Sequence, residues 1–514
     1  MAGYDVVEVG LAALAADMAA GAVTSEALVE AYRERIATID SAGPALRSVI
    51  SLNPRAAEEA RAMDAERRAG AVRGPLHGAP LLIKDNIETS DGSATTAGSL
   101  ALQDNVTGRD APLVARLKAA GAVIVGKANL SEWANFRSEH SISGWSAIGG
   151  LVKNPYVLDR SVAGSSSGTG SAIAASLAAA GVGTETDGSV TAPSSLCGLV
   201  GLKPTLGLVS RTRVVPISHS QDTAGPMCRS VADAALLLTA MAGSDPADAA
   251  TAQADARRVD YAAALGAATL KGKRLGVLTY ACAHFPAGVD ALFATALDLM
   301  RREGAEVIEL TDYRPPDTLG RQEHAVLLTE FKADLEAYLA TTPTAVRTRT
   351  LAELIDFNRA TPREMALFGQ ELFEAAEATT GLDDPEYLAA RAACLAAAGV
   401  GGIDLLTAKH RLDALIAPSY GPAWRIDTAA GDRGSGRISS LPAIAGYPNL
   451  TVPMGLVREL PVGLAFVGPA WTDAALLALG HAFERAAAAR RPPTYRASLE
   501  AEPDFEAASR PAME

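Results

Sequence analysis

A stretch of small residues from Ala163 to Pro193 constrains the fold of this chain more than any other feature. It reads AGSSSGTGSAIAASLAAAGVGTETDGSVTAP, so glycines and serines flank a middle part that is rich in alanine. We predict a helix from about Thr169 to Ala180, buried because it lacks a polar face. Loops of glycine and serine at both ends leave backbone amides and hydroxyls open to a ligand. The stretch therefore predicts a site formed by ordered loops on a buried helix.

The composition argues against several classes of function. The chain has 514 residues and a net charge of −13, with no basic run that could serve as a nucleic-acid footprint. No apolar run approaches the ~20 residues of a membrane span, and the first residues lack the basic segment of a signal peptide. The four cysteines stand far apart, which fits reduced thiols. We expect a cytoplasmic protein without a nucleic-acid or membrane partner.

Strand-like and helix-like segments alternate along much of the chain, which favours an α/β fold. We predict helices near 11–39, 54–69, 113–120, 231–241 and 291–302, and a helical, alanine-rich region over 311–400. Strands are predicted at 81–83, 122–125, 199–204, 206–210, 274–279, 306–310, 415–418, 449–453 and 461–467.

Lys84 ends the apolar run Leu81-Leu82-Ile83 instead of lying on a polar helix face. A lysine at a strand end often extends its ammonium group to water. If the side chain is buried instead, desolvation lowers its pKa and makes a neutral amine available as a base. The residues alone leave both interpretations open.

Three motifs suggest other chemistry, and each lacks its structural context. Gly164-Ser165-Ser166-Ser167-Gly168 matches the GxSxG elbow of α/β-hydrolases with Ser166 as nucleophile, but the preceding PYVLDRSVA does not resemble a buried strand. The candidate partners His410 and His481 lie in helical segments, and no lysine follows a serine at the SxxK spacing. Gly121-x4-Gly126-Lys127 resembles a P-loop, but Ala128 replaces the required Ser/Thr.

Together these residues resemble the amidase signature family of Ser-Ser-Lys amide hydrolases, from about Glu26 to Arg490. The resemblance rests on GPLHGAP before Lys84-Asp85-Asn86, then on GSSSG, GTETDGS and CGLVGLKPT. Ser165 and Ser189 are 24 residues apart, which is the spacing of the family and selects Ser165 over Ser166.

The resemblance implies a catalytic mechanism without a metal or cofactor. Ser189 would attack the amide carbonyl as nucleophile, and Lys84 would act as the base. Ser165, on a cis peptide bond, would relay the proton between them.

The resemblance also implies an oxyanion hole formed by the backbone N–H groups of Thr186, Asp187, Gly188 and Ser189. The family usually has Gly-Gly-Ser before the nucleophile, whereas this chain has Asp187-Gly188-Ser189. A negative charge at 187 would oppose a developing oxyanion unless the carboxylate points away.

Within the family, the chain resembles the peptide amidase branch, whose members hydrolyse the C-terminal carboxamide of peptides. The segments NLSEWANFRS, SISGWSA and IAGYPNLTVPMG carry this likeness. It implies that Trp133 and Asn135 lie near the scissile amide, and that the substrate is a peptide amide or a small acyl or aryl amide. The alternatives are a glutaminase-type subunit of an amidotransferase, an esterase that uses Ser166, and an inactive binding protein.

The same resemblance implies one domain over residues 1–490, with a large twisted mixed sheet surrounded by helices. We divide it into N-terminal helices (1–70), a catalytic core (71–265), a cap-like helical region (311–400) and a return to the core (401–490). The tail 491–514 is rich in proline, alanine and glutamate, and we expect it to be poorly ordered. A monomer or a homodimer is expected.

Overall fold

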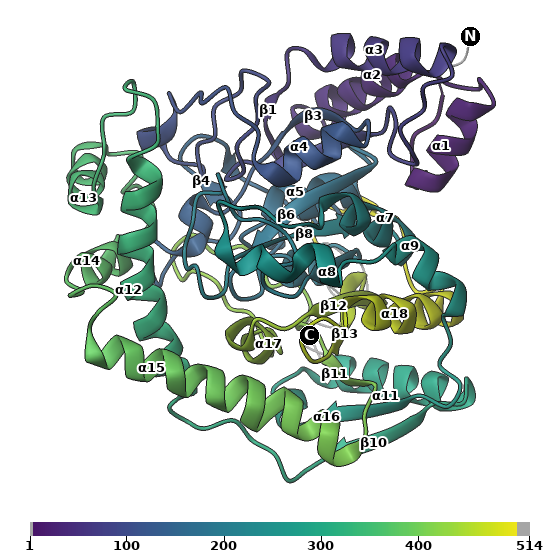
Figure 1. Cartoon of the computed structure of the whole chain (residues 1–514), viewed down its shortest axis with the longest axis vertical. Helices are drawn as coiled ribbons and strands as arrows, with labels where there is room; N and C mark the ends of the chain where they lie inside the picture. The colour runs from purple at the N-terminus through teal and green to yellow at the C-terminus, as the bar shows by residue number, and fades with distance from the viewer. Residues whose placement is uncertain (1–3, 501–514) are drawn as a thin grey trace, which may run out of the picture.

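A mixed sheet of 11 strands forms the centre of the computed structural model, which describes residues 4–500 (Figure 1). Its strand order is β1-β3-β2-β6-β8-β7-β12-β13-β11-β9-β10, and a separate pair is formed by β4 (Trp145–Ser146) and β5 (Gly150–Leu151). The strands of the large sheet are β1 (Val49–Leu52), β2 (Pro80–Lys84), β3 (Val123–Ala128), β6 (Ala180–Glu185), β7 (Val200–Lys203), β8 (Thr223–Cys228), β9 (Arg274–Leu278), β10 (Glu306–Leu310), β11 (Ala414–Pro418), β12 (Asn449–Val457) and β13 (Leu460–Val467). The predicted fold class, a large mixed sheet surrounded by helices, is confirmed.

Helices cover both faces of this sheet, because its strands are apolar on both sides. In β2, Leu81 and Ile83 belong to one apolar cluster and Leu82 to another, as the alternation of side chains along a strand requires. The α-helices are α1 (Leu11–Ala19), α2 (Ser25–Arg35), α3 (Ala56–Arg68), α4 (Pro112–Ala119), α5 (Ser167–Ala174), α6 (Thr191–Leu196), α7 (Val231–Met241), α8 (Ala254–Arg257), α9 (Tyr261–Ala264), α10 (Thr279–Cys282), α11 (Ala287–Arg302), α12 (Leu319–Leu339), α13 (Leu351–Ala360), α14 (Glu371–Glu377), α15 (Pro385–Leu395), α16 (Asp404–His410), α17 (Ser440–Ala445) and α18 (Asp473–Ala487).

The parallel pairing of β2 with β6 positions the site. Leu81 pairs with Ala180 and Ile83 with Val182, so the carboxyl ends of the two strands lie side by side. Lys84 is the last residue of β2, and the loop that carries Ser189 follows the end of β6. Residues that are more than 100 positions apart therefore meet at one edge of the sheet.

The helix predicted from Thr169 to Ala180 is shorter than expected. The helix α5 ends at Ala174, and the strand β6 begins at Ala180 inside the same stretch. Glycine and alanine in β6 concealed this strand, since they lack the β-branched side chains typical of strands. They are needed for close packing: a Cβ atom at Gly181 would lie 2.6 Å from Thr169 Cγ2 and 3.0 Å from Ile173 Cγ1 of α5.

One further strand prediction is wrong, and the described part of the tail is tied down by hydrogen bonds. The segment 206–210 forms turns instead of a strand, and Leu206 N–H donates to Gly446 O, beyond the end of α17. Residues 491–500 are held against the body: Tyr495 N–H donates to Pro155 O at 2.9 Å, and Leu158 N–H donates to Arg496 O at 2.8 Å. The rest of the predicted tail, 501–514, lies outside the described residues.

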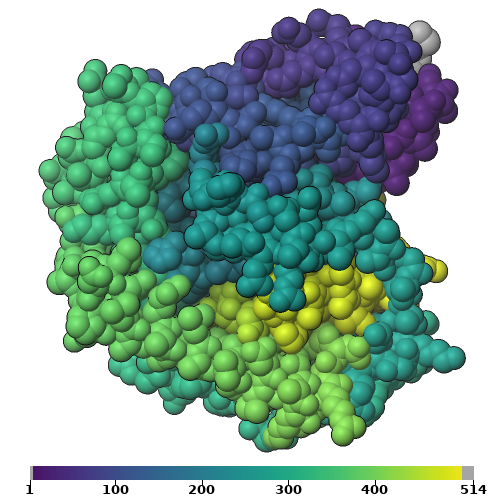
Figure 2. All heavy atoms as spheres, viewed as in Figure 1, coloured from purple at the N-terminus to yellow at the C-terminus, as the bar shows by residue number. Residues whose placement is uncertain are grey.

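The helical region predicted over 311–400 forms one side of the molecule, drawn in green in Figures 1 and 2. Its helix α12 packs against both α14 and α15. The continuous helix Pro385–His410, which includes α15 and α16, is long and apolar enough to cross a membrane by length and composition alone. That indication is weak, because it rests on a single helix, which also packs along one side against α12 and α17.

Candidate active site

Lys84 is completely buried at the end of β2. Its Nζ lies 2.8 Å from Ser165 Oγ, 2.8 Å from Thr184 Oγ1 and 3.2 Å from Thr184 O. Burial lowers the pKa of Lys84 to about 7, while the negative charges of Asp222 and Glu185 act in the opposite direction. Of the two interpretations that the apolar run left open, the structure shows the buried one.

Thr184 orients the amine toward Ser165. A neutral amine has two N–H donors and one lone pair. The oxygens Oγ1 and O of Thr184 accept the two N–H groups, so the lone pair is left for the hydroxyl of Ser165. In this arrangement a neutral Lys84 amine can accept a proton from Ser165, whereas the ammonium form donates to Ser165 Oγ.

Ser165 precedes α5, and its backbone is fixed on both sides. The peptide bond between Gly164 and Ser165 is cis, as the resemblance implies. Ser131 N–H donates to Ser165 O at 3.0 Å, and the next amide, Ser166 N–H, donates to Ser189 O at 3.1 Å. The last contact ties the Ser165 turn directly to the residue expected to be the nucleophile.

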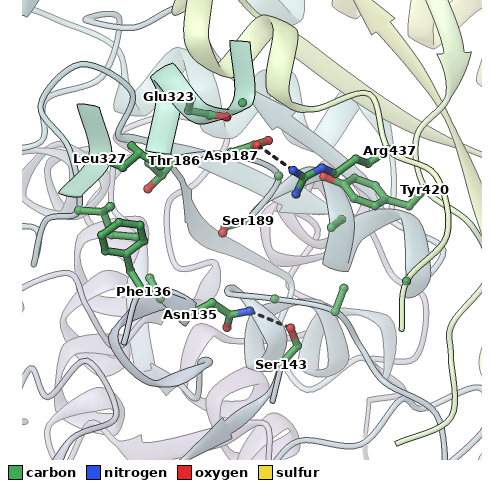
Figure 3. A pocket seen from close by; sticks show the side chains of 18 of the residues that line it. Asn135, Phe136, Ser143, Thr186, Asp187, Ser189, Glu323, Leu327, Tyr420 and Arg437 are labelled. Carbon is green, nitrogen blue, oxygen red and sulfur yellow. Dashed lines mark hydrogen bonds and ion pairs between the residues drawn. The ribbon is translucent and has the colours of Figure 1, made fainter. Parts of the chain in front are cut away.

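Ser189 lies in a loop that a buried carboxylate organises. Glu185, at the end of β6, accepts hydrogen bonds from Val190 N–H at 2.8 Å and Thr191 N–H at 2.8 Å through Oε2. These contacts fold the loop back on β6, and the helix α6 begins at Thr191. The Ser189 side chain is only 8% exposed, and it points into the adjoining pocket (Figure 3).

The backbone amides of residues 186–189 are available at this pocket. Within residues 4–500, none of these four N–H groups donates to a protein acceptor. Gly188 has φ +85°, a conformation that suits glycine and turns the loop so that Ala192 N–H reaches Gly188 O at 2.7 Å. Unpaired amides in a tight turn form a concave donor surface for an anion.

The carboxylate of Asp187, which lines the pocket, is held by two neighbours. Ser440 Oγ donates to Asp187 Oδ2 at 2.7 Å, and an amino group of Arg437 lies 4.0 Å from the same oxygen (Figure 3). The positive charge of Arg437 thus offsets part of the negative charge that replaces the usual glycine.

The pocket in front of Ser189 has a volume of about 860 Å³, which is enough for a peptide fragment. Figure 3 shows Phe136 and Leu327 on one side, with Tyr420 and Arg437 on the other. Sequence reasoning missed much of this wall, because it comes from segments without motifs. The missed residues are Ile217, His284, Glu323, His324, Leu327, Tyr420, Trp424 and Arg437.

Of the two residues expected near the scissile amide, only Asn135 lines the pocket. Its Nδ2 donates to Ser143 Oγ at 2.9 Å. Trp133 is buried instead, and its ring packs edge-on against Phe373 with the centroids 5.8 Å apart. Positive φ angles at 133–135 separate the two residues, since the chain turns sharply between them.

Ser166 lies in surroundings that do not suit a hydrolase elbow. Its Oγ donates to Thr184 O at 3.0 Å and accepts from Thr184 N–H at 3.2 Å. Neither contact is with a histidine, and Ser166 does not line the pocket. The side chain has a structural role between α5 and β6.

One group of side chains has the geometry of a metal site. His219, Glu330 and Asp334 have potential ligand atoms within 4.8 Å of one another. These atoms already form hydrogen bonds: His219 Nδ1 contacts Asp334 Oδ2 at 3.0 Å, and Ser218 Oγ donates to Glu330 Oε2 at 2.5 Å. The group fastens the loop at 218–220 to α12.

Comparison with known proteins identifies the family. Residues 27–477 match the model of the family described as Amidase. The chain belongs to the amidase signature family. It is an amide hydrolase, as the resemblance implied.

Individual relatives cover almost the whole chain. The structure of native peptide amidase from Stenotrophomonas maltophilia is 50% identical, with a TM-score of 0.89, and the match covers 95% of this chain and 99% of that one. A probable amidase of Arabidopsis thaliana is 41% identical over 92% of this chain and 89% of its own. One subunit of the glutamyl-tRNA(Gln) amidotransferase of Roseiflexus castenholzii is 35% identical over 91% of this chain and 94% of its own.

Proposed function

We propose that this amidase hydrolyses the C-terminal carboxamide of peptides and releases ammonia, with Ser189 as nucleophile, Ser165 as relay and Lys84 as base. The 2.8 Å contact between Lys84 Nζ and Ser165 Oγ, beside a pocket that Ser189 faces, carries the proposal. The 50% identity to a peptide amidase supports the choice of substrate.

In the first half of the reaction, Ser189 Oγ attacks the carbonyl carbon. Its proton moves to Ser165 while the Ser165 proton moves to Lys84, so the amine becomes an ammonium group. The amides of residues 186–189 donate to the oxyanion. Each such donor typically contributes about 3–4 kcal/mol to stabilisation of the transition state.

Collapse of the tetrahedral intermediate breaks the C–N bond. The proton held by Lys84 returns through Ser165 to the leaving nitrogen, which departs as ammonia. Water then attacks the acyl-Ser189 ester, and the same relay accepts its proton and returns it to Ser189. No net proton is gained or lost by the protein over the cycle.

Substitution of Ser189 and of Lys84, the residues on either side of the Ser165 relay, tests this assignment. Ser189→Ala and Lys84→Ala should each remove nearly all ammonia release from a peptide amide, with unchanged circular dichroism. A fluorophosphonate probe, located by peptide mapping, should label Ser189. Full activity in either variant, or label on Ser166, would contradict the assignment.

A second candidate function is a glutaminase that supplies ammonia to a partner, favoured by the 35% identity to the amidotransferase of Roseiflexus castenholzii. Purified chain should decide between the two functions. Ammonia release is measured on peptide amides, aliphatic amides, aryl amides and glutamine. Faster hydrolysis of glutamine than of any peptide amide would favour the second candidate.

A further inference from the structure

A small cavity of about 10 Å³ lies directly behind the catalytic lysine. Its walls include Thr184, which accepts a hydrogen bond from Lys84 Nζ, together with Asn86, Asp222, Arg211 and Val214. The last three residues also line an outer pocket of about 480 Å³. The cavity therefore lies between the hydrogen-bond partner of Lys84 and a second, outer pocket, and it also borders the substrate pocket through Ala134, Thr186 and Ile217.

One donor hydrogen, on the Thr184 hydroxyl, and one acceptor, Asn86 Oδ1, have no hydrogen-bond partner at this cavity within residues 4–500. Thr184 Oγ1 accepts from Lys84 Nζ at 2.8 Å and from Asn86 Nδ2 at 3.0 Å, so both of its lone pairs are used and its own hydrogen needs another acceptor. Asn86 is 3% exposed, and its Oδ1 is the second of these groups, a buried acceptor. A polar cavity of this size holds about one water molecule.

The carboxylate of Asp222, which also lines the cavity, can accept one more hydrogen bond. Thr186 Oγ1 donates to its Oδ1 at 2.5 Å, and the amides of Ile217 and Ser218 donate to its Oδ2 at 2.7 and 2.9 Å. A carboxylate accepts about four hydrogen bonds, so one position stays open. A water in the cavity could accept from Thr184 and donate to both Asn86 and Asp222.

We propose that this cavity holds a structural water, and that Thr184, the water and Asp222 form a proton-exchange route between Lys84 and the outer pocket. In one direction, Lys84 gives a proton to Thr184 Oγ1, Thr184 gives its hydroxyl proton to the water, and the water gives one to Asp222. One proton leaves the ammonium group and one O–H bond forms on the carboxyl group. Asp222 then exchanges this proton with solvent in the outer pocket.

Such a route matters because bound substrate fills the pocket in front of Ser189. A molecule that binds substrate while Lys84 is an ammonium group has no base, and the substrate blocks access of solvent from that side. Exchange through Asp222 restores the neutral amine without release of substrate. The inference rests on the proposed role of Lys84 as base, and it makes Asp222 a positioning residue that acts through Lys84.

The charges around these groups determine the direction of the expected effects. Lys84 is influenced by Asp222 and Glu185, and both carboxylates favour its ammonium form. Asp222 itself is influenced by Asp334 and Arg211, and burial raises its pKa to about 6. The charged and titratable groups of the outer pocket are Arg109, Arg211, Arg213, His219, Asp222, Asp248, Asp334 and Tyr338.

The test compares Asp222→Asn with Arg213→Gln, a control that removes a charge from the outer pocket but does not line the cavity. Labelling of Ser189 by a fluorophosphonate, followed against pH, reports the base in the open pocket. In Asp222→Asn, the pH at which the labelling rate falls to half should decrease by roughly half a unit, because a negative charge near Lys84 is lost. Turnover of a saturating peptide amide at pH 6.5 should instead fall several-fold.

These opposite effects distinguish the route from a structural defect, which would slow both reactions. An unmoved labelling profile, unchanged turnover, or equal loss in both assays would overturn the proposal, as would the same effects in Arg213→Gln. Formate should restore turnover in Asp222→Ala, and failure to do so would also count against the route.

A crystal structure of the wild-type protein supplies an independent test. Electron density for a water within hydrogen-bond distance of Asn86 Oδ1 is expected, and an empty cavity would overturn the proposal. Failure of the proposed function is recognisable separately, because wild-type Ser189 would then take no label at any pH.

Discussion

Gly188 faces the hydroxyl group of Tyr420 so closely that a Cβ atom at position 188 would lie 2.1 Å from that oxygen. Tyr420 cannot withdraw freely, because its hydroxyl donates to Ser439 Oγ at 2.6 Å. The turn that presents the amides of residues 186–189 is therefore fixed both by a positive φ angle and by a side chain from a distant segment.

Gly188→Ala should lower kcat/KM by about 100-fold or more, since displacement of the turn removes oxyanion donors. The measurement is ammonia release from a peptide amide, with the melting temperature recorded in parallel. Gly266→Ala is the matched control, because a Cβ atom there meets no atom of the described residues within 4 Å. Equal activity of the two variants would show that the turn is not needed for catalysis.

Activity should rise with pH through about 7. Only the neutral amine of Lys84 accepts a proton, and burial lowers its pKa to about 7. The logarithm of kcat/KM should therefore increase with a slope near one below this pH and level off above it. A profile that is flat between pH 5.5 and 8 would contradict the role of Lys84 as base.

The sequence anticipated the chemistry at this site better than the pocket around it. Short motifs with the spacing of the family contain Lys84, Ser165 and the loop 186–189. These positions could therefore be predicted as site residues from the sequence alone. Glu323 and Arg437 belong to α12 and to a loop more than 100 residues further along, and neither stands in a motif. Only the packing of α12 against the loop at 218–221 brings Glu323 to the pocket.

The strand β6 shows why local propensity was misleading. Its sequence AGVGTE favours neither a strand nor a helix by composition, and its identity depends on pairing with β2 and β8. Trp133 illustrates the same limit, because the direction of its side chain follows from the turn at 133–135 and from the apolar cluster that includes Phe373.

Activity should also decline above about pH 8 through Glu323. Burial and the negative charge of Asp187 raise the pKa of Glu323 to about 8, despite a 3.0 Å hydrogen bond from Gln221. Ionisation adds a second negative charge beside Asp187 and opposes the oxyanion. Glu323→Gln should keep full activity to about pH 9, whereas Glu303→Gln, on the surface, should decline like wild type. A decline that persists in Glu323→Gln would assign it to another group.

Lys84 should lower the stability of the fold that uses it. Its folded pKa of about 7 lies below the value near 10.4 of an unfolded chain. Between these values the unfolded chain binds more protons, so stability should rise with pH across this window. Lys84→Met should raise the free energy of unfolding at pH 7 by about 2 kcal/mol while abolishing activity, since an apolar side chain needs no ionisation change.

Lys127→Met is the matched comparison, because Lys127 is also fully buried but lies 3.2 Å from the buried carboxylate of Asp85. Removal of this partner leaves an uncompensated charge, so the variant should lose about 3 kcal/mol or more. Denaturant titrations at pH 7 and 9.5 measure both effects. If Lys84→Met destabilised the protein as much as Lys127→Met, the amine of Lys84 would be charged in the folded state, and the assignment of a neutral base would fail.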